Sequence, residues 1–337
     1  MIPGILNVGH HPASHAVEVA QLGESVGFEQ FWVADERFYR DAYALLTAVA
    51  LSTQRITMGT CVTDPYTRHP ALTTVSVATL DEMSNGRALF GLGSGISGFI
   101  ELGLERPKPI AAMREAIELF RRMLTGEVVD YDGKIIKFHS GRLNFMPPRA
   151  TIPVYVASNG PQGQRMAARI ADGVIMEACS QPEEAEAFVK GVRDAAKEAG
   201  RDPASVRCIA RLNACVASDG KAARDAVRLR AGRIMAAGRT VFATHDELGL
   251  RLPAAVLAEV ADVPYAAGGA PYERILPHVT DRHVDAVALA GTLEDVTARV
   301  AALKAVGIDG ITISPYAPPG ETTASTVRAL GPVIAAA

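Results

Sequence analysis

Short apolar runs alternate with amphipathic segments along nearly the whole chain. The runs are rich in β-branched residues and are bounded by turn residues, which is typical of buried parallel strands covered by helices. We expect eight such strands, the number that closes a barrel. They span residues 4–8, 30–35, 55–62, 87–94, 153–158, 173–178, 206–216 and 310–316. The pattern therefore predicts an α/β fold, a (β/α)8 TIM barrel.

The segments between these strands carry the period of helices. After Pro109, the apolar residues Met113, Ile117 and Phe120 recur at spacings of four and three, and Gly126 ends the segment. This spacing predicts an amphipathic helix that begins at a proline and stops before a glycine.

Two stretches exceed a minimal barrel. Residues 127–150 alternate around Asp132-Gly133, which predicts a β-hairpin inserted after the fourth helix. Residues 239–290 predict a longer insertion of mixed helix and loop between strands seven and eight. Because no low-complexity linker interrupts the chain, we expect residues 1–337 to form a single domain.

Composition narrows the class of protein. The chain has 337 residues, is 48% hydrophobic and carries a net charge of −3, so nucleic acid and anionic membranes are not expected partners. No apolar run reaches the roughly 20 residues of a membrane span. The first residues lack the basic and apolar regions of a secretion signal, so we expect a cytoplasmic protein. The cysteines form no metal-binding pattern, which predicts reduced thiols and no metal; they are Cys61, Cys179, Cys208 and Cys215.

The expected strands end in polar or glycine-rich loops. Because the sites of such barrels lie on the loops after the strands, these loops are where chemistry is expected. In "GSGISG", Gly93, Gly95 and Gly98 match the dinucleotide-binding pattern G-x-G-x-x-G. That pattern also needs an acidic residue about 20 positions on, at the end of a second strand. Here the acidic residues at that distance lie inside an amphipathic helix, so we do not favour a dinucleotide fold.

The stretch "SNGPQGQR" favours an anion site. Its small residues Ser158, Asn159 and Gly160 let backbone N–H groups approach a ligand, and Pro161 is suited to begin a helix. A phosphate there would be favoured by the helix dipole and could meet Arg165. A tight turn that needs glycine explains the same residues equally well.

The loop "ADERFYRD" offers two adjacent carboxylates. In an extended strand end Asp35 and Glu36 point to opposite faces, so one is expected to face the barrel mouth, where it could pass a proton. The alternative is that Asp35 and Glu36 are both charged residues of a solvated loop before a helix. His10, His11 and Glu177 are candidate substrate contacts on other strand ends, although single histidines are weak signals.

Several stretches together resemble a known family. They are "VADERFYRDAYALL", "MGTCVTDPYTRHPALTTVSVATLDEMSNGRALFGLGSG", "PIAAMREAIELFRRMLTGE", "PPRATIPVYVASNGP" and "AARIADGVI". Their order and spacing resemble the bacterial-luciferase-like oxidoreductase superfamily. The chain is most similar to its coenzyme F420-dependent branch, typified by methylenetetrahydromethanopterin reductase. The likeness covers most of the chain.

The resemblance implies a barrel with a deazaflavin across its C-terminal rim. The third strand would end in a cis peptide bond not followed by proline, at Cys61-Val62, whose residues back the ring. Asp35 would hydrogen-bond the deazaflavin, and Thr63 with Asp64 would line the ring or its ribityl chain. The remaining residues implied at the cofactor are Ser94, Gly95 and Ala157, with Ser158, Asn159, Gly160 and Pro161 on its phosphate.

The reaction implied is hydride transfer, with a protein acid or base managing the proton. Relatives often carry histidine where this chain has Glu36, which makes Glu36 the candidate acid or base. Leu6 stands where the pterin reductases have a glutamate, which weakens the case for a pterin. Ile96 stands where the sugar-phosphate dehydrogenases have a catalytic glutamate, and no lysine follows strand six, so glucose 6-phosphate is not favoured.

The leading hypothesis is therefore an F420-dependent oxidoreductase acting on an unidentified small molecule. The first alternative is an FMN-dependent luciferase-like monooxygenase, which would use reduced flavin and oxygen. The second is a non-catalytic cofactor-binding barrel, since folds retain shape when activity is lost. The resemblance also implies a homodimer that pairs through the helices beside strands two and three.

Overall fold

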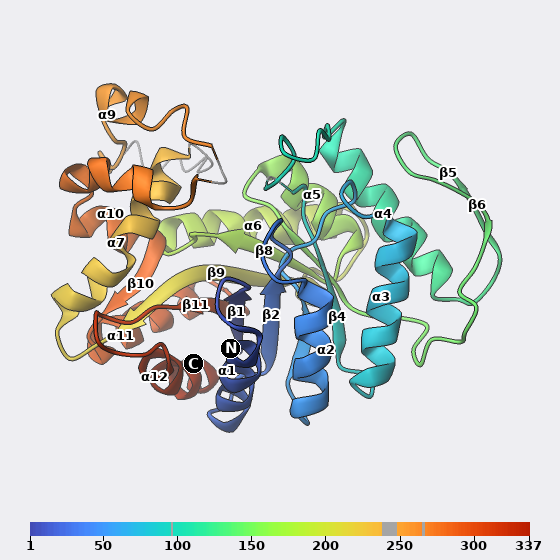
Figure 1. Cartoon of the computed structure of the whole chain (residues 1–337), viewed down its shortest axis with the longest axis horizontal. Helices are drawn as coiled ribbons and strands as arrows, with labels where there is room; N and C mark the ends of the chain where they lie inside the picture. Colours follow the sequence, from blue (N-terminus) through green and yellow to red (C-terminus); the bar gives the residue numbers. More distant parts are fainter. Residues whose placement is uncertain (96, 238–247, 265–266) are drawn as a thin grey trace.

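Eight parallel strands close a barrel in the computed structural model, which describes residues 1–95, 97–237, 248–264 and 267–337 (Figure 1). Each strand pairs with the next along the chain, and the last pairs with the first. The predicted (β/α)8 barrel is confirmed. The barrel strands are β1 (Ile2–Val8), β2 (Gln30–Ala34), β3 (Thr57–Thr60), β4 (Ala88–Leu92), β7 (Val154–Ala157), β8 (Gly173–Glu177), β9 (Arg207–Val216) and β11 (Gly310–Pro315).

Helices cover the outside of the barrel (Figure 1). Four of them begin at a proline, whose missing N–H costs nothing in the first turn. The predicted helix that begins at Pro109 is present, and Gly126 follows its end with a φ of 77°. The outer helices are α1 (Ala13–Ser25), α2 (Ala42–Ser52), α3 (Pro70–Met83), α4 (Pro109–Met123), α5 (Pro161–Ile170), α6 (Pro182–Glu198), α7 (Gly220–Ala236), α11 (Leu293–Ala305) and α12 (Ala324–Ala336).

Large side chains fill the interior of the barrel. Trp32 from β2 packs edge-on against Tyr155 from β7, with ring centroids 5.4 Å apart. Ile175 and Ile209 join the same buried cluster from β8 and β9. Because side chains alternate along a strand, the residues two positions further on also face inward, and they reach the C-terminal rim. The interior of the barrel is therefore a packed core, and the inward-facing residues at its C-terminal rim are the ones placed to contact a ligand.

The two insertions lie at opposite ends of the molecule (Figure 1). The predicted hairpin is present as β5 (Val129–Asp132) and β6 (Lys137–Gly141), joined by residues 133–136 and packed beside α4. On the other side, the described part of the second insertion contains α9 (Ala254–Ala258), the 3₁₀ segment η3 (Ala270–His278) and α10 (Asp281–Val287). A short 3₁₀ turn, η1 (Pro203–Ser205), precedes β9.

One strand was not predicted. β10 (Ala288–Gly291) pairs with the C-terminal end of β9, outside the closed barrel. Its sequence "ALAG" is too short and too poor in β-branched residues to be distinguished from the end of a helix.

Within the described ranges, none of the helices combines the length and the apolar character that crossing a membrane requires.

Candidate active site

A cavity of about 550 Å³ opens at the C-terminal rim of the barrel. Pockets for small ligands and cofactors typically measure roughly 300–1,000 Å³, so this one has room for both a cofactor and a small substrate. Most of the predicted residues line it: His10, Asp35, Glu36, Cys61, Val62, Ser94, Gly95, Ala157, Ser158, Asn159, Gly160 and Glu177.

Both adjacent carboxylates face this cavity. Sequence alternation predicted that only one of Asp35 and Glu36 would do so, and this expectation is wrong, because β2 ends at Ala34 and the chain leaves its extended path there. Asp35 is held in place: Thr63 Oγ1 donates a hydrogen bond of 2.7 Å to its Oδ2, and the Arg37 guanidinium lies 3.1 Å from its Oδ1.

Thr63 and Asp64 lie behind the cavity wall. Both are fully buried and neither lines the cavity, which corrects the expectation of direct contact with a cofactor. Asp64 accepts hydrogen bonds of 2.8 and 2.9 Å from the backbone N–H groups of Tyr66 and Thr67, and it also pairs with Arg37. The two residues thus support the loop after β3 and fix Asp35 and Arg37 from behind.

The chain after β3 forms one wall of the cavity. The Cys61-Val62 peptide bond is cis, as the resemblance implied. Gly93, from the end of β4, packs directly on this wall, since a Cβ built there would lie 2.5 Å from Val62 Cγ2. Burial raises the pKa of the Cys61 thiol to about 12, so this side chain is a neutral wall residue at physiological pH.

The loop after β7 and the start of α5 form another part of the cavity. The Asn159 side chain accepts a hydrogen bond of 2.9 Å from the Glu177 backbone N–H and donates one of 3.2 Å to the Glu177 carbonyl. α5 has no side-chain N-cap, so its first-turn N–H groups have no such acceptor. Pro161 is the first residue of this helix and does not line the cavity.

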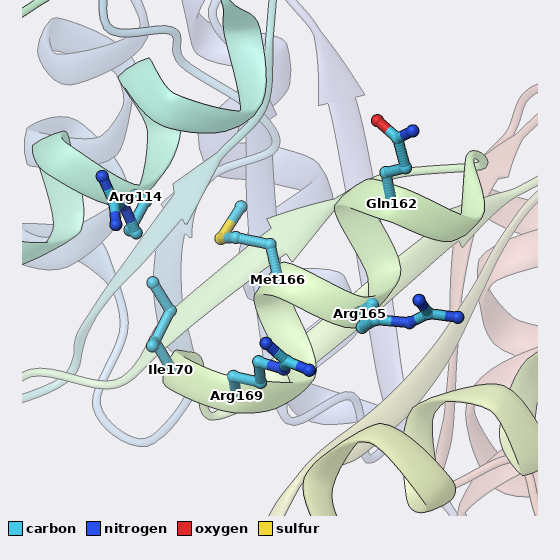
Figure 2. Close-up of a pocket in the computed structure, with 6 residues that line it drawn as sticks. All are labelled: Arg114, Gln162, Arg165, Met166, Arg169 and Ile170. Carbon is cyan, nitrogen blue, oxygen red and sulfur yellow. The ribbon is translucent and has the colours of Figure 1, made fainter. Parts of the chain in front are cut away.

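Arg165 lies on α5 outside this cavity. It borders a separate hollow of about 290 Å³ between α4 and α5, and its side chain extends away from Arg114 (Figure 2). The expectation that Arg165 could meet a phosphate in the main site is therefore not supported by its position. The hollow is lined by Arg114, Gln162, Arg165, Met166, Arg169 and Ile170, none of which lines the main cavity.

Three histidine rings lie close together, tilted to one another, beside the rim. The His11 ring lies 4.0 Å from His10 and 4.4 Å from His15, but only His10 lines the cavity. Burial lowers the pKa of His10 and His15, which favours neutral rings at pH 7.

In the part of the chain that the structure describes, no group of three or more His, Cys, Asp or Glu side chains could hold a metal ion. Ile96, named for its departure from the sugar-phosphate dehydrogenases, lies outside the described residues.

Four arginines line the cavity and were not predicted. They are Arg37, Arg211, Arg230 and Arg233, accompanied by Asn213. Arg211 and Asn213 stand two positions apart in β9, "RCIARLNACV", which is buried throughout after its first residue. Polar residues at a spacing of two in a buried strand share its inward face, and this was the signal that could have identified them. The arginines of α7 carry no comparable signal.

The comparisons with known proteins agree on one family. The family model described as luciferase-like monooxygenase matches residues 3–310. A 5,10-methylenetetrahydromethanopterin reductase from Methanolobus tindarius is 33% identical over 319 residues, covering 94% of each chain. One from Archaeoglobus fulgidus is 33% identical and covers 88% of this chain and 89% of its own. The structure of a coenzyme F420 dependent tetrahydromethanopterin reductase from Methanopyrus kandleri superposes with a TM-score of 0.87 at 26% identity, covering 98% of this chain and 97% of that one.

Proposed function

We propose a function on the premise that the chain belongs to the luciferase-like monooxygenase family and is an oxidoreductase. In this proposal the protein transfers a hydride between coenzyme F420 and a small organic substrate. The relatives named above span nearly the whole chain, and one of them is described as F420 dependent. We do not extend their pterin substrate to this chain, because the cavity presents Leu6 where the resemblance implies a glutamate.

The observation that carries the proposal is the set of residues that line the rim cavity. It brings together an apolar wall at Val62, a fixed carboxylate at Asp35 and the uncapped start of α5 after Gly160. A flat ring, a hydrogen-bonding ring edge and a phosphate need these three environments. The residues present therefore fit a deazaflavin that carries a phosphate.

We assign roles on this basis. Cys61 and Val62 would lie against one face of the ring, and Asp35 would accept a hydrogen bond from its edge. The loop Ser158–Gly160 and the first-turn N–H groups of α5 would hold the phosphate, where the helix dipole favours negative charge. When bound, the deazaflavin supplies a carbon that gives or takes a hydride.

Glu36 is the residue that we propose for proton transfer. Glu36 lines the same cavity as Asp35, and Asp35 is held by Thr63 and Arg37. An acid or base must lie within reach of the reacting atom, and Glu36 lines the cavity in which that atom would lie.

Fluorescence titration of the pure protein with coenzyme F420 and with FMN tests the cofactor. We expect tighter binding of the deazaflavin. Tight FMN binding with none for F420 would contradict the proposal and favour the monooxygenase alternative.

Glu36→Gln tests the acid or base role. We expect a fall in kcat with little change in the cofactor Kd, as for a group that acts in the transition state. Glu186→Gln on α6, an exposed glutamate that does not line the cavity, is the matched control. Unchanged turnover in Glu36→Gln would assign the proton to another group.

We also propose that the protein pairs as a homodimer through α2 and α3. These neighbouring helices expose four large apolar side chains, with exposed fractions of 65% for Leu51, 58% for Leu72, 39% for Val75 and 38% for Met83. Burying such a surface is favourable in water. Light scattering should give twice the chain mass, and Leu72→Lys should shift it toward the monomer. A monomeric wild-type protein would refute the pairing.

A further inference from the structure

One corner of the cavity is built from side chains that the proposed cofactor contacts do not use. We call it the arginine corner: Glu177 from β8, Arg211 from β9, and Arg230 and Arg233 from α7. Glu177 and Arg211 are paired residues of neighbouring strands, and their side chains form an ion pair. Arg230 lies 3.2 Å from the same Glu177 oxygen. Two guanidinium groups therefore share one carboxylate.

Arg233 adds a third positive charge. It follows Arg230 by three positions, so both project from the same face of α7. Its guanidinium lies over the Tyr272 ring, 5.3 Å from the centroid, and within the described ranges no carboxylate is within ion-pair distance of it. Tyr272 also lines the cavity, which places this pair at its edge. An aromatic face orients a guanidinium but leaves its N–H fork open to an anion.

The charges of the arginine corner point the same way. Its described residues are three arginines and one carboxylate, so positive charge is in excess there. An anionic group of the substrate would offset this excess. In a partly enclosed cavity an unbalanced charge is costly, because water screens it poorly.

Asn213 provides an independent observation at the same wall. It is only 2% exposed, it lines the cavity, and its Oδ1 is without a hydrogen-bond partner among the described residues. Its register partner on β11 is Ser314, which also lines the cavity and accepts a hydrogen bond of 3.2 Å from Arg211. Buried amides are normally paired, so an unpaired one beside a cavity indicates a ligand that supplies the missing donor.

From these observations we infer that the substrate is a small hydroxy acid, or the corresponding oxo acid, whose carboxylate binds the arginine corner at Arg233 and Arg230. The inference rests on the proposed function and names its substrate class. In the direction of reduction, the carbonyl carbon of the oxo acid gains the hydride and its oxygen gains a proton from the protein, so the C=O bond becomes an alcohol while the reduced cofactor is oxidised. The hydroxyl of the product can donate to the amide of Asn213.

The test compares matched probes with the full chain loaded with reduced F420. Pyruvate carries the carboxylate, methyl pyruvate lacks its charge, and dihydroxyacetone phosphate carries a phosphate instead. We expect kcat/KM for pyruvate to exceed that for the ester by about 10- to 100-fold, the range of a hydrogen-bonded charge pair. Equal values for acid and ester, or a preference for the phosphate, would overturn the inference.

Two variants of Arg233 and one control variant localise the effect. Arg233→Met should raise KM for pyruvate by about tenfold or more and leave the ester unchanged, and Arg233→Lys should recover part of the loss. Lys221→Met removes one positive charge from the exposed start of the same helix and should behave like wild type. If Arg233→Met instead weakens F420 binding and spares the KM for pyruvate, the arginine corner holds the cofactor and the inference is wrong.

Failure of the inference and failure of the proposed function are distinguishable. The F420 Kd, measured without substrate, reports the proposed function alone. Calorimetric titration of pyruvate into the cofactor-free protein reports the arginine corner alone, and binding should be lost in Arg233→Met. F420 binding without any pyruvate binding would overturn only the substrate class.

Discussion

Gly93→Ala is the sharpest test of the proposed cofactor wall. The new methyl group would lie 2.5 Å from Val62 Cγ2 and 3.4 Å from Val62 Cβ, and carbon atoms in contact are normally about 3.5–4.0 Å apart. The closer carbon must therefore move by about 1 Å or more. Val62 is β-branched and stiff, so it cannot avoid the clash with a small rotation. It must move with its backbone, and the open direction is the cavity.

Overpacking of this kind costs about 1–3 kcal/mol. If the displaced Val62 enters the space that the ring needs, that cost appears in binding, and the F420 Kd should rise by about 5- to 150-fold. Fluorescence titration measures it, and a thermal melt measures any part of the cost that falls on folding. Gly191→Ala is the control, because that glycine lies in α6 with nothing within 4 Å of a new Cβ.

The control variant should bind F420 like wild type and melt at the same or a slightly higher temperature, since alanine favours a helix. The reasoning about the wall is refuted if Gly93→Ala leaves both the Kd and the melting temperature unchanged. A lower melting temperature with an unchanged Kd would show that Val62 is not part of the binding surface.

Three further predictions follow from contacts behind and beside the site. Thr63→Val removes the 2.7 Å hydrogen bond to Asp35 and should weaken F420 binding by about tenfold at nearly unchanged stability, measured by titration and thermal melting; an unchanged Kd would contradict the role of Asp35. Burial opposes the charge of Glu115, but hydrogen bonds from three backbone N–H groups of the hairpin lower its pKa, so its stabilisation of the hairpin is present above the unfolded pKa of 4.5 and is lost as pH falls through the lower folded value. Glu115→Gln should reduce hydrogen-exchange protection at residues 134–136 at neutral pH, and equal protection in both proteins would contradict this role of Glu115. Burial raises the pKa of Cys61 to about 12, so its rate of alkylation should still rise between about pH 9 and about pH 11. Mass spectrometry follows the alkylation, and a rate that reaches a plateau by about pH 9 would contradict the raised pKa.

The sequence predicted the barrel because its signals are local. Each predicted strand is an apolar run that is buried on both faces, and each helix beside it carries its own period, so no long-range information is needed. Strand ends were less certain. The alternation rule was extended to Glu36, but it holds only while the chain stays extended, and β2 stops two residues earlier at Ala34.

The site was only partly predictable for the same reason. Thr63 and Asp64 were expected at the cavity because they follow a strand, yet their burial is decided by contacts with Arg37 and the next loop. Arg230 and Arg233 reach the cavity because α7 packs beside the rim, which is a tertiary fact that the sequence of α7 does not carry. Arg211 was accessible to sequence reasoning, since a charged residue inside a buried strand needs an inward partner.

The paired hydrogen bonds between Asn159 and Glu177 have a consequence for ligand binding. Asn159 belongs to the loop proposed for the cofactor phosphate, and the carboxylate of Glu177 holds the arginine corner. Occupying one side would therefore stiffen the other, and thermodynamic reciprocity requires that each ligand then tighten its partner equally. We expect synergistic binding, so that the apparent affinity for each ligand rises as the other saturates its site. Initial rates that vary both reactants would measure this coupling, and independent affinities would show that the two sites are not coupled.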